Sequence, residues 1–199
     1  FDKIGQVKDT ALTDAVLPTE LADPVGQCDY IYIDGYLLAF TDGSASNGTH
    51  RYLARAGWGV FFASDSPFNC SYPLYGPVQT SYRAELKALL HVVRTAGVRT
   101  IVMCDCTSVV DTYNKYVQGR LDPHQFLAER DLWEKVFGGI PMDQPDFILV
   151  RWMPSHMDEA HKVEERKAAL LKGLVTEHDI GGNAHVDLLA KKGANMHVG

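Results

Sequence analysis

The junction of an apolar run with an acid, Phe40-Thr41-Asp42-Gly43-Ser44, constrains the fold of this chain more than any other stretch. The run that leads into it, Tyr36–Phe40, is followed by a polar segment rich in Gly, Ser and Asn, which predicts a buried strand. A carboxylate at the end of a core strand is unfavourable unless a positive charge compensates it. An Asp before Gly also starts many surface turns. The positions of the other acids in the chain are therefore needed to distinguish a functional site from a turn.

Two further acids lie on predicted elements that can end beside Asp42. Thr100–Cys104 is an apolar strand candidate that is followed directly by Asp105 and then by a predicted helix, so an acid again stands at a strand end. Glu85 lies on the clearest predicted helix, Tyr82–Thr95, on the apolar stripe that faces the core. A Glu on such a stripe needs a partner, although the helix dipole also favours a Glu early in a helix.

The remaining elements predict a mixed sheet with helices. Three strands joined by short connections predict an antiparallel meander, and strands that alternate with helices predict a parallel part of the sheet. The predicted strands are Tyr30–Ile33 as a short extra strand, Tyr36–Thr41, Ala56–Ala63, Cys70–Gly76, Thr100–Cys104 and Phe147–Trp152. Open sheets of this kind bind ligands beyond the carboxyl ends of their strands.

The C-terminal part of the chain predicts two helices. Asp158–Leu174 is rich in Glu, Lys and Ala and predicts a mainly solvated helix. Gly181-Gly182-Asn183 predicts a break in the chain, after which Ala184–Lys192 predicts a last helix with Asn183 as its N-cap. Asp187 lies in the second turn of that helix and is the fourth candidate acid.

Composition limits the classes of function. The 199 residues are 46% hydrophobic and 22% charged, which is enough for a sizeable core, and no apolar run approaches the length of a membrane helix. The net charge of −6 counts against a nucleic-acid binder, because such proteins are usually basic. Bound cations would offset acids that form a metal site, so the charge does not exclude one.

The chain predicts a short N-terminal segment followed by one domain. Residues 1–29 predict an extension or linker, with one short helix around residues 10–16, and residues 30–199 predict the domain. Because the chain begins with Phe1 and carries no signal peptide, we expect a fragment of a longer polyprotein or a processed start. The four cysteines form no paired motif, which favours an intracellular protein of the nucleus or cytoplasm.

Five segments in this order resemble the ribonuclease H type 1 family. They are Thr41-Asp42-Gly43-Ser44, Tyr82-Arg83-Ala84-Glu85-Leu86, Cys104-Asp105, Trp152-Met153-Pro154-Ser155-His156 and Gly182-Asn183-Ala184-His185-Val186-Asp187-Leu188-Leu189-Ala190. The resemblance, over about residues 36–196, implies a ribonuclease H-like α/β fold: a five-stranded mixed sheet, its first three strands antiparallel, flanked by helices on both faces. It also implies an endoribonuclease that hydrolyses the RNA strand of RNA–DNA hybrids and produces 5′-phosphomonoesters.

The resemblance further implies a role for each candidate catalytic residue. The four acids would hold two Mg²⁺ ions, with Mn²⁺ as a substitute, because phosphodiester hydrolysis develops charge on both the attacking water and the leaving oxygen. Asp42 would bridge both ions, and Asp187 would complete the ion that activates water. Glu85 and Asp105 would hold the ion on the leaving-group side. His156 would assist proton transfer or product release, and a surface loop His is the plain alternative.

Five polar residues are candidates for substrate contact. Ser44 and Asn47 lie in the predicted loop after the first long strand, and Gln79, Thr80 and Ser81 precede the first long helix. Polar groups and free N–H donors at such places can contact sugar and phosphate. A simple capping segment with Ser81 as the N-cap explains the second group nearly as well.

Two regions depart from the family pattern. Residues 117–129 carry Arg120 but also Asp122 and Glu129, whereas many family members have a basic helix and loop there that grips the substrate. Residues 158–179 insert a predicted helix where the family loop is much shorter, as in some retroelement ribonuclease H domains. The implied partners are an RNA–DNA hybrid and a covalently linked reverse transcriptase or other polyprotein domain, and we expect the isolated domain to be a monomer.

Two other functions stay open at this point. A ribonuclease H-like structural or tethering module of a polyprotein would explain the acidic balance, but it gives no reason to keep four acids and His156 together. A nuclease or integrase of the same superfamily that acts on DNA is less favoured, because the chain has the Tyr82–Leu86 segment and a terminal Asp187 rather than a Glu. A comparison of cleavage of an RNA–DNA hybrid with cleavage of duplex DNA distinguishes a ribonuclease H from a DNA nuclease.

Overall fold

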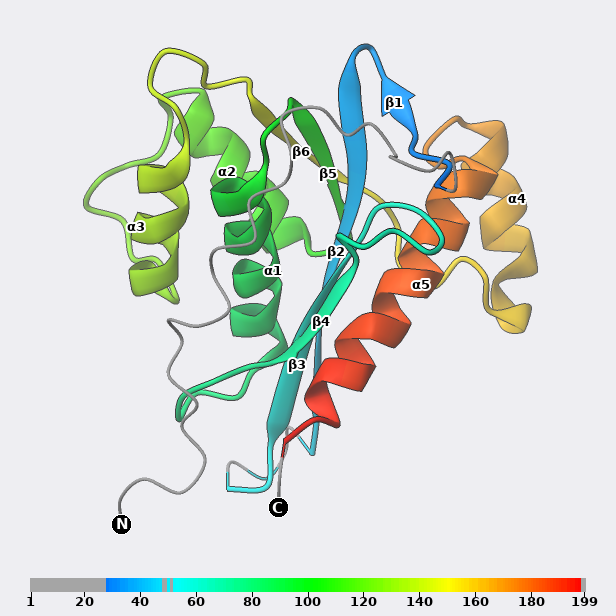
Figure 1. Cartoon of the computed structure of the whole chain (residues 1–199), viewed down its shortest axis with the longest axis horizontal. Helices are drawn as coiled ribbons and strands as arrows, with labels where there is room; N and C mark the ends of the chain where they lie inside the picture. Colours follow the sequence, from blue (N-terminus) through cyan, green and yellow to red (C-terminus); the bar gives the residue numbers. More distant parts are fainter. Residues whose placement is uncertain (1–27, 48–49, 51, 198–199) are drawn as a thin grey trace.

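A mixed sheet with helices on both faces forms the described part of the chain, residues 28–47, 50 and 52–197, in this computed structural model (Figure 1). The strands are β1 (Tyr32–Ile33), β2 (Tyr36–Ser46), β3 (Arg55–Phe61), β4 (Cys70–Pro73), β5 (Thr100–Cys104) and β6 (Ile148–Trp152). The helices are α1 (Ser81–Thr95), α2 (Thr107–Val117), α3 (Arg130–Gly139), the short 3-10 helix η1 (Ala160–Lys162), α4 (Val163–Leu171) and α5 (Glu177–Ala194). None of these helices combines the length and the apolar character needed to cross a bilayer. The helix predicted around residues 10–16 lies outside the described residues.

The sheet has the strand order β4-β3-β2-β5-β6, and β1 pairs with β2 as a sixth strand. β2, β3 and β4 pair antiparallel, whereas β5 pairs parallel with both β2 and β6. The predicted five-stranded mixed sheet is therefore confirmed, and the predicted extra strand is confirmed as the two residues of β1. Asp34 and Gly35 connect β1 to β2 with positive φ angles, which suit a tight hairpin turn.

Two apolar layers hold the helices on the sheet. Leu37 and Ala39 of β2 pack with buried residues of α1, α2 and α3 on one face, whereas Leu38 and Phe40 pack with those of α4 and α5 on the other. This alternation follows from the two-residue period of a strand, and it makes β2 apolar on both sides. Figure 1 shows the same arrangement, with α5 running diagonally across one face of the sheet.

β2 continues past Asp42, which corrects the prediction that the strand ends there. Its last residues, 42–46, pair antiparallel with β3, so Ser44 lies in a strand and not in a loop. The Gly and Ser residues predicted a loop because they favour strands poorly in isolation, but the pairing with β3 determines the structure here.

Two helix starts differ from the predictions. Thr80, and not Ser81, is the N-cap of α1, and its hydroxyl accepts a hydrogen bond from the Arg83 N–H at 3.1 Å. α5 begins farther upstream than predicted, at a capping box in which Thr176 and Asp179 each accept a hydrogen bond from the other's backbone N–H. The helix predicted over residues 158–174 is present in a shorter form, as η1 and α4.

α5 runs through Gly181-Gly182-Asn183 without a break, so Asn183 is not an N-cap. The reason is packing: a Cβ atom on Gly182 would lie 2.4 Å from two carbons of the Phe40 ring. Glycine at this position lets the helix approach β2 closely, and the buried contact outweighs the poor helix propensity of glycine.

Replacing Gly182 with Ala should lower the free energy of unfolding by about 1–3 kcal/mol, because the new methyl group overlaps the Phe40 ring in a packed core. Gly181→Ala is the matched control: a Cβ atom there meets nothing within 4 Å, and Ala should stabilise the helix by about 0.5–1 kcal/mol. Urea unfolding of both variants measures the two effects. Equal effects of the two substitutions would contradict the packing explanation.

Candidate active site

Asp42 lies where β2 changes its partners. β2 pairs with β5 as far as the register of Phe40 with Met103, and beyond that point its pairing continues with β3. β5 ends at Cys104, and Asp105 follows it directly. Because the two parallel strands separate at this edge, Asp42 and Asp105 reach the same place from neighbouring strands.

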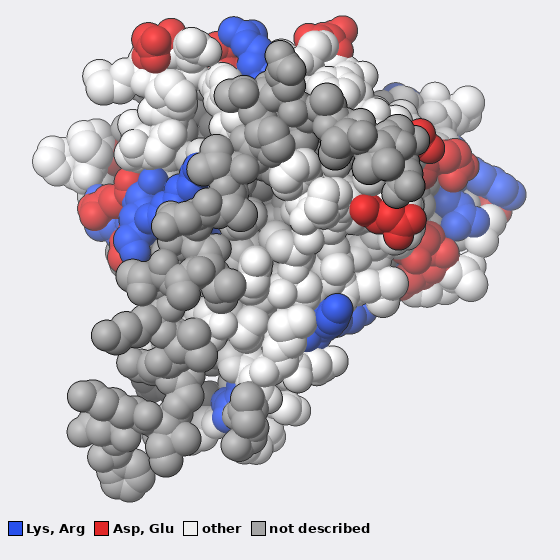
Figure 2. Space-filling view, viewed as in Figure 1, with Lys and Arg blue, Asp and Glu red and all other residues white. Residues whose placement is uncertain are grey.

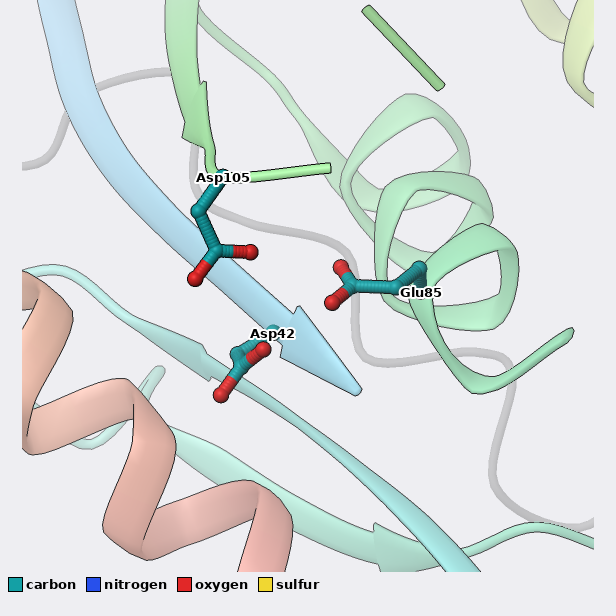
Figure 3. A group of neighbouring side chains, drawn as sticks. All are labelled: Asp42, Glu85 and Asp105. Carbon is teal, nitrogen blue, oxygen red and sulfur yellow. The ribbon is translucent and has the colours of Figure 1, made fainter. Parts of the chain in front are cut away.

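Gly43 brings the third acid to this place. A Cβ atom on Gly43 would lie 2.4 Å from the backbone nitrogen of Glu85 and 2.7 Å from the carbonyl oxygen of Ser81, so α1 packs directly on the backbone of β2. One carboxylate oxygen from each of Asp42, Glu85 and Asp105 lies within 4.8 Å of the other two. Figure 3 shows the three side chains pointing toward one another from β2, α1 and the end of β5.

Burial and mutual repulsion raise the pKa values of these carboxyl groups. Asp42 is 5% exposed, and its burial, followed by the charge of Asp105, raises its pKa to about 7. Burial and the charges of Asp42 and Asp105 also raise the pKa of Glu85 well above its ordinary value. Burial raises the pKa of Asp105 too, while hydrogen bonding from Asn183 acts in the opposite direction.

The donor set fits divalent cations such as Mg²⁺. Three converging carboxylates offer the hard oxygen ligands that Mg²⁺ prefers, and a cation among them would cancel the repulsion that raises their pKa values. The acids line a pocket of about 620 Å³, which leaves space for water and phosphate oxygens beside them. The chain thus presents a site in which bound cations are favourable.

Asp187 lines the same pocket but stands apart from the group of three. It lies on α5, and its Oδ2 accepts a hydrogen bond from the Nζ of Lys191, one turn later, at 2.7 Å. The structure thus brings all four predicted acids to one pocket. The metal-ligand roles assigned to them remain predictions.

His156 also lines the pocket, on the loop after β6, where its backbone has a φ of 55°. Its N–H donates to the Asn183 side chain at 3.2 Å, and the Asn183 amide in turn donates to Asp105 at 3.4 Å. The imidazole Nδ1 lies 3.5 Å from a carboxylate oxygen of Glu159. Asn183, which was predicted as an N-cap, therefore connects the His156 loop to Asp105.

The sequence did not indicate three residues as functional candidates. Glu159 and Lys191 line the pocket, and Asn183 contacts two of its residues, His156 and Asp105. Lys191 follows Asp187 by four residues on a predicted helix, a spacing that allows the two side chains to meet. Glu159 follows His156 by three residues in a loop, where spacing gives no such signal. The position of Asn183 had no such signal, because it depends on the continuity of α5.

Two of the five predicted substrate contacts lie at the pocket, namely Ser44 and Ser81. Asn47 and Thr80 do not line it; Asn47 lies in a bend just beyond β2, and Thr80 caps α1. The five assignments remain predictions of substrate contact.

The side chain of Gln79 connects β3 to the segment after β4. Its Oε1 accepts a hydrogen bond from the Ala56 N–H at 2.8 Å, and its Nε2 donates to the carbonyl oxygens of Leu74 and Gly76, each at 2.8 Å. The amide is thus engaged in holding the start of α1 in place, which gives Gln79 a structural role.

The metal-free protein should lose stability as the pH rises from about 4 to about 7. The folded pKa of Asp42, about 7, lies above its ordinary value of 3.8, so the folded state binds more protons in this range. Asp42→Asn should therefore raise the free energy of unfolding at pH 8 by roughly 2 kcal/mol or more, and raise it by clearly less at pH 5, where only part of this loss has occurred. Thermal unfolding in EDTA at both pH values measures this.

Asp143→Asn provides the control, because Asp143 is an exposed acid in the turn between α3 and β6. Added Mg²⁺ should stabilise the unmodified chain and the control but not Asp42→Asn. Lower stability of Asp42→Asn at pH 8 would mean that the ionised carboxylate supports the fold.

Several solved structures share this fold. The solution structure of the PFV RNase H domain matches with a TM-score of 0.57 and 20% identity, covering 86% of this chain and 98% of that domain. A crystal structure of Prototype Foamy Virus protease–reverse transcriptase matches with a TM-score of 0.57 and 22% identity, covering 79% of this chain and 20% of that protein. A foamy viral protease–reverse transcriptase in complex with an RNA/DNA hybrid matches with a TM-score of 0.55 and 16% identity, covering 94% of this chain and 24% of that protein. At these identities the likeness shows the fold alone.

Sequence relatives extend the comparison. Human Ribonuclease H1 is 26% identical over 182 residues, which cover 89% of this chain and 56% of the human protein. Ribonuclease H of Schizosaccharomyces pombe is 47% identical over 66 residues, which cover 32% of this chain and 24% of that protein. The chain thus matches about half or less of the length of these relatives. The RNase H family model matches residues 34–195, and the chain therefore belongs to the ribonuclease H family.

Proposed function

We propose that this chain hydrolyses the RNA strand of RNA–DNA hybrids with two Mg²⁺ ions, for which Mn²⁺ can substitute, and leaves 5′-phosphomonoesters. The observation that carries the proposal is the convergence of Asp42, Glu85 and Asp105, with oxygens within 4.8 Å of one another, in the pocket that Asp187 also lines. Membership of the ribonuclease H family supports this reading over a chance cluster of acids.

The four acids would hold the ions. Asp42 is central to the group, since the charges of Asp105 and Asp187 both act on it, and it would be shared between the two ions. Glu85 and Asp105 would complete the coordination of one ion, and Asp187 would complete that of the other. When bound, the ions would stabilise negative charge on the attacking water and on the leaving oxygen.

The chain's own groups would orient the reaction. His156 lies on the rim of the pocket, where its imidazole can accept or donate a proton, and the carboxylate of Glu159 beside Nδ1 would hold the ring in position. Asn183 supports the backbone of this loop. The hydroxyls of Ser44 and Ser81 line the same pocket and would contact sugar or phosphate oxygens.

Substrate grip is expected to depend on salt and on a neighbouring domain. Arg83 donates two hydrogen bonds to Asp131, at 2.8 and 3.0 Å, and pairs with Glu129, so acids of the α2–α3 region engage its charge. Figure 2 shows acidic and basic side chains interspersed over α3 and over α4 on one face. We propose that the domain acts while linked to a polynucleotide-binding partner such as a reverse transcriptase.

Asp42→Asn and Asp105→Asn should each lower cleavage of the RNA strand of a hybrid by more than about a hundredfold, because each removes a cation ligand. The assay uses an end-labelled RNA–DNA hybrid at low salt, with Mg²⁺ or Mn²⁺, beside duplex DNA and duplex RNA. Asp143→Asn is the control and should cleave as the unmodified chain does.

The proposal is abandoned if neither this chain nor a longer one that includes its neighbouring domains cleaves the hybrid. A tethering module would then explain the fold. Cleavage of duplex DNA in place of the hybrid would identify a DNA nuclease.

His156→Ala should slow turnover by about tenfold or more without abolishing it, because assisted proton transfer is lost while the cation site remains. His124→Ala is the control, since His124 is exposed and does not line the pocket. Single-turnover and steady-state rates on the same hybrid separate chemistry from product release. Unaltered rates in both regimes would remove His156 from the active site.

A further inference from the structure

Lys191 is a pocket residue to which the proposed reaction gives no role. It follows Asp187 by one turn of α5, and both side chains line the pocket that holds Asp42. The Lys191 Nζ lies 2.7 Å from Asp187 Oδ2. Within the described part of the chain, Asp187 is the one acid of the four that forms an ion pair with a lysine or arginine.

The four acids thus have two kinds of electrostatic surroundings. Asp42, Glu85 and Asp105 face one another and repel, which favours a cation among them. The Asp187 carboxylate already has a cation, the Lys191 ammonium, on one of its two oxygens. A divalent ion at Asp187 must therefore displace this ammonium or bind beside a like charge.

The geometry points to Lys191 as a built-in counter-cation of Asp187, which delays completion of the second cation site until a substrate phosphate draws the ammonium away. This inference rests on the proposed function and specifies how its site is assembled. It assigns Lys191 a positioning role, since the lysine acts through Asp187.

The exposure of the pair makes this exchange feasible. The Lys191 side chain is 56% exposed and that of Asp187 is 17% exposed, so the ammonium can swing into solvent while the carboxylate stays in the pocket. Exposed ion pairs are weak, and a phosphate is a strong alternative partner for an ammonium. A phosphodiester beside the acids would therefore take Lys191 and free Asp187 for a cation.

The test measures Mn²⁺ binding to the substrate-free protein. The electron paramagnetic resonance signal of free Mn²⁺ reports how much of the ion remains unbound. The unmodified chain should bind one Mn²⁺ more tightly than a second. Lys191→Met should tighten the second site by about fivefold, the effect of losing one exposed ion-pair competitor. Lys191→Arg, which keeps the charge, should restore the original isotherm. Lys192→Met is the control, because Lys192 is exposed and does not line the pocket.

Hybrid binding in EDTA tests the second half of the inference. Lys191→Met should weaken binding and lower the slope of log affinity against log salt by about one, as expected for the loss of one phosphate contact. Lys191→Arg should keep the slope. An unchanged slope in Lys191→Met would overturn the transfer of Lys191 to phosphate.

The outcomes separate this inference from the proposed function. Normal cleavage by the unmodified chain, with the same Mn²⁺ isotherm in Lys191→Met as in Lys192→Met, would overturn the role of Lys191 and leave the function standing. Failure of the unmodified chain to bind any Mn²⁺ would overturn both.

Discussion

The two unlike partners of β2 determine where chemistry can occur in this domain. β2 pairs with parallel β5 only as far as Phe40 and continues beside antiparallel β3 to Ser46. The backbone of Asp42 is therefore held in a ladder on one side while its other side is open. Asp105 from the end of β5 and Glu85 from α1 reach this open side.

Assembly of the acids is unfavourable without cations, and the fold compensates through packing. Gly43 lets α1 contact the β2 backbone, and apolar layers on both faces of β2 fix the strand beneath it. The repulsion among Asp42, Glu85 and Asp105 is thereby held in a rigid frame. A preorganised site of this kind gains its stability when cations arrive and not during folding.

The strands, helices and acids could be predicted wherever neighbouring residues in the sequence determine them. Asp105 directly follows an apolar run, and Glu85 lies on a core-facing stripe, so each is anomalous within its own segment. The course of α5 could not be predicted in this way, because Gly181 and Gly182 look alike in the sequence. Gly182 alone of the two meets the Phe40 ring, a residue far away along the chain. The same limit applies to Asn183, because its place inside α5 depends on the helix continuing through the two glycines.

Asn183 joins the His156 loop to the acids, since its side chain accepts from the His156 backbone and donates to Asp105. The Asn183 side chain thus contacts both a surface loop and a partly buried carboxylate. Coupling free energies are reciprocal: if an ordered loop favours a cation at Asp105, that cation must favour an ordered loop by the same amount. Amide hydrogen exchange in residues 153–159 would then report whether a cation is bound at Asp105, although none of these backbone amides needs to contact it.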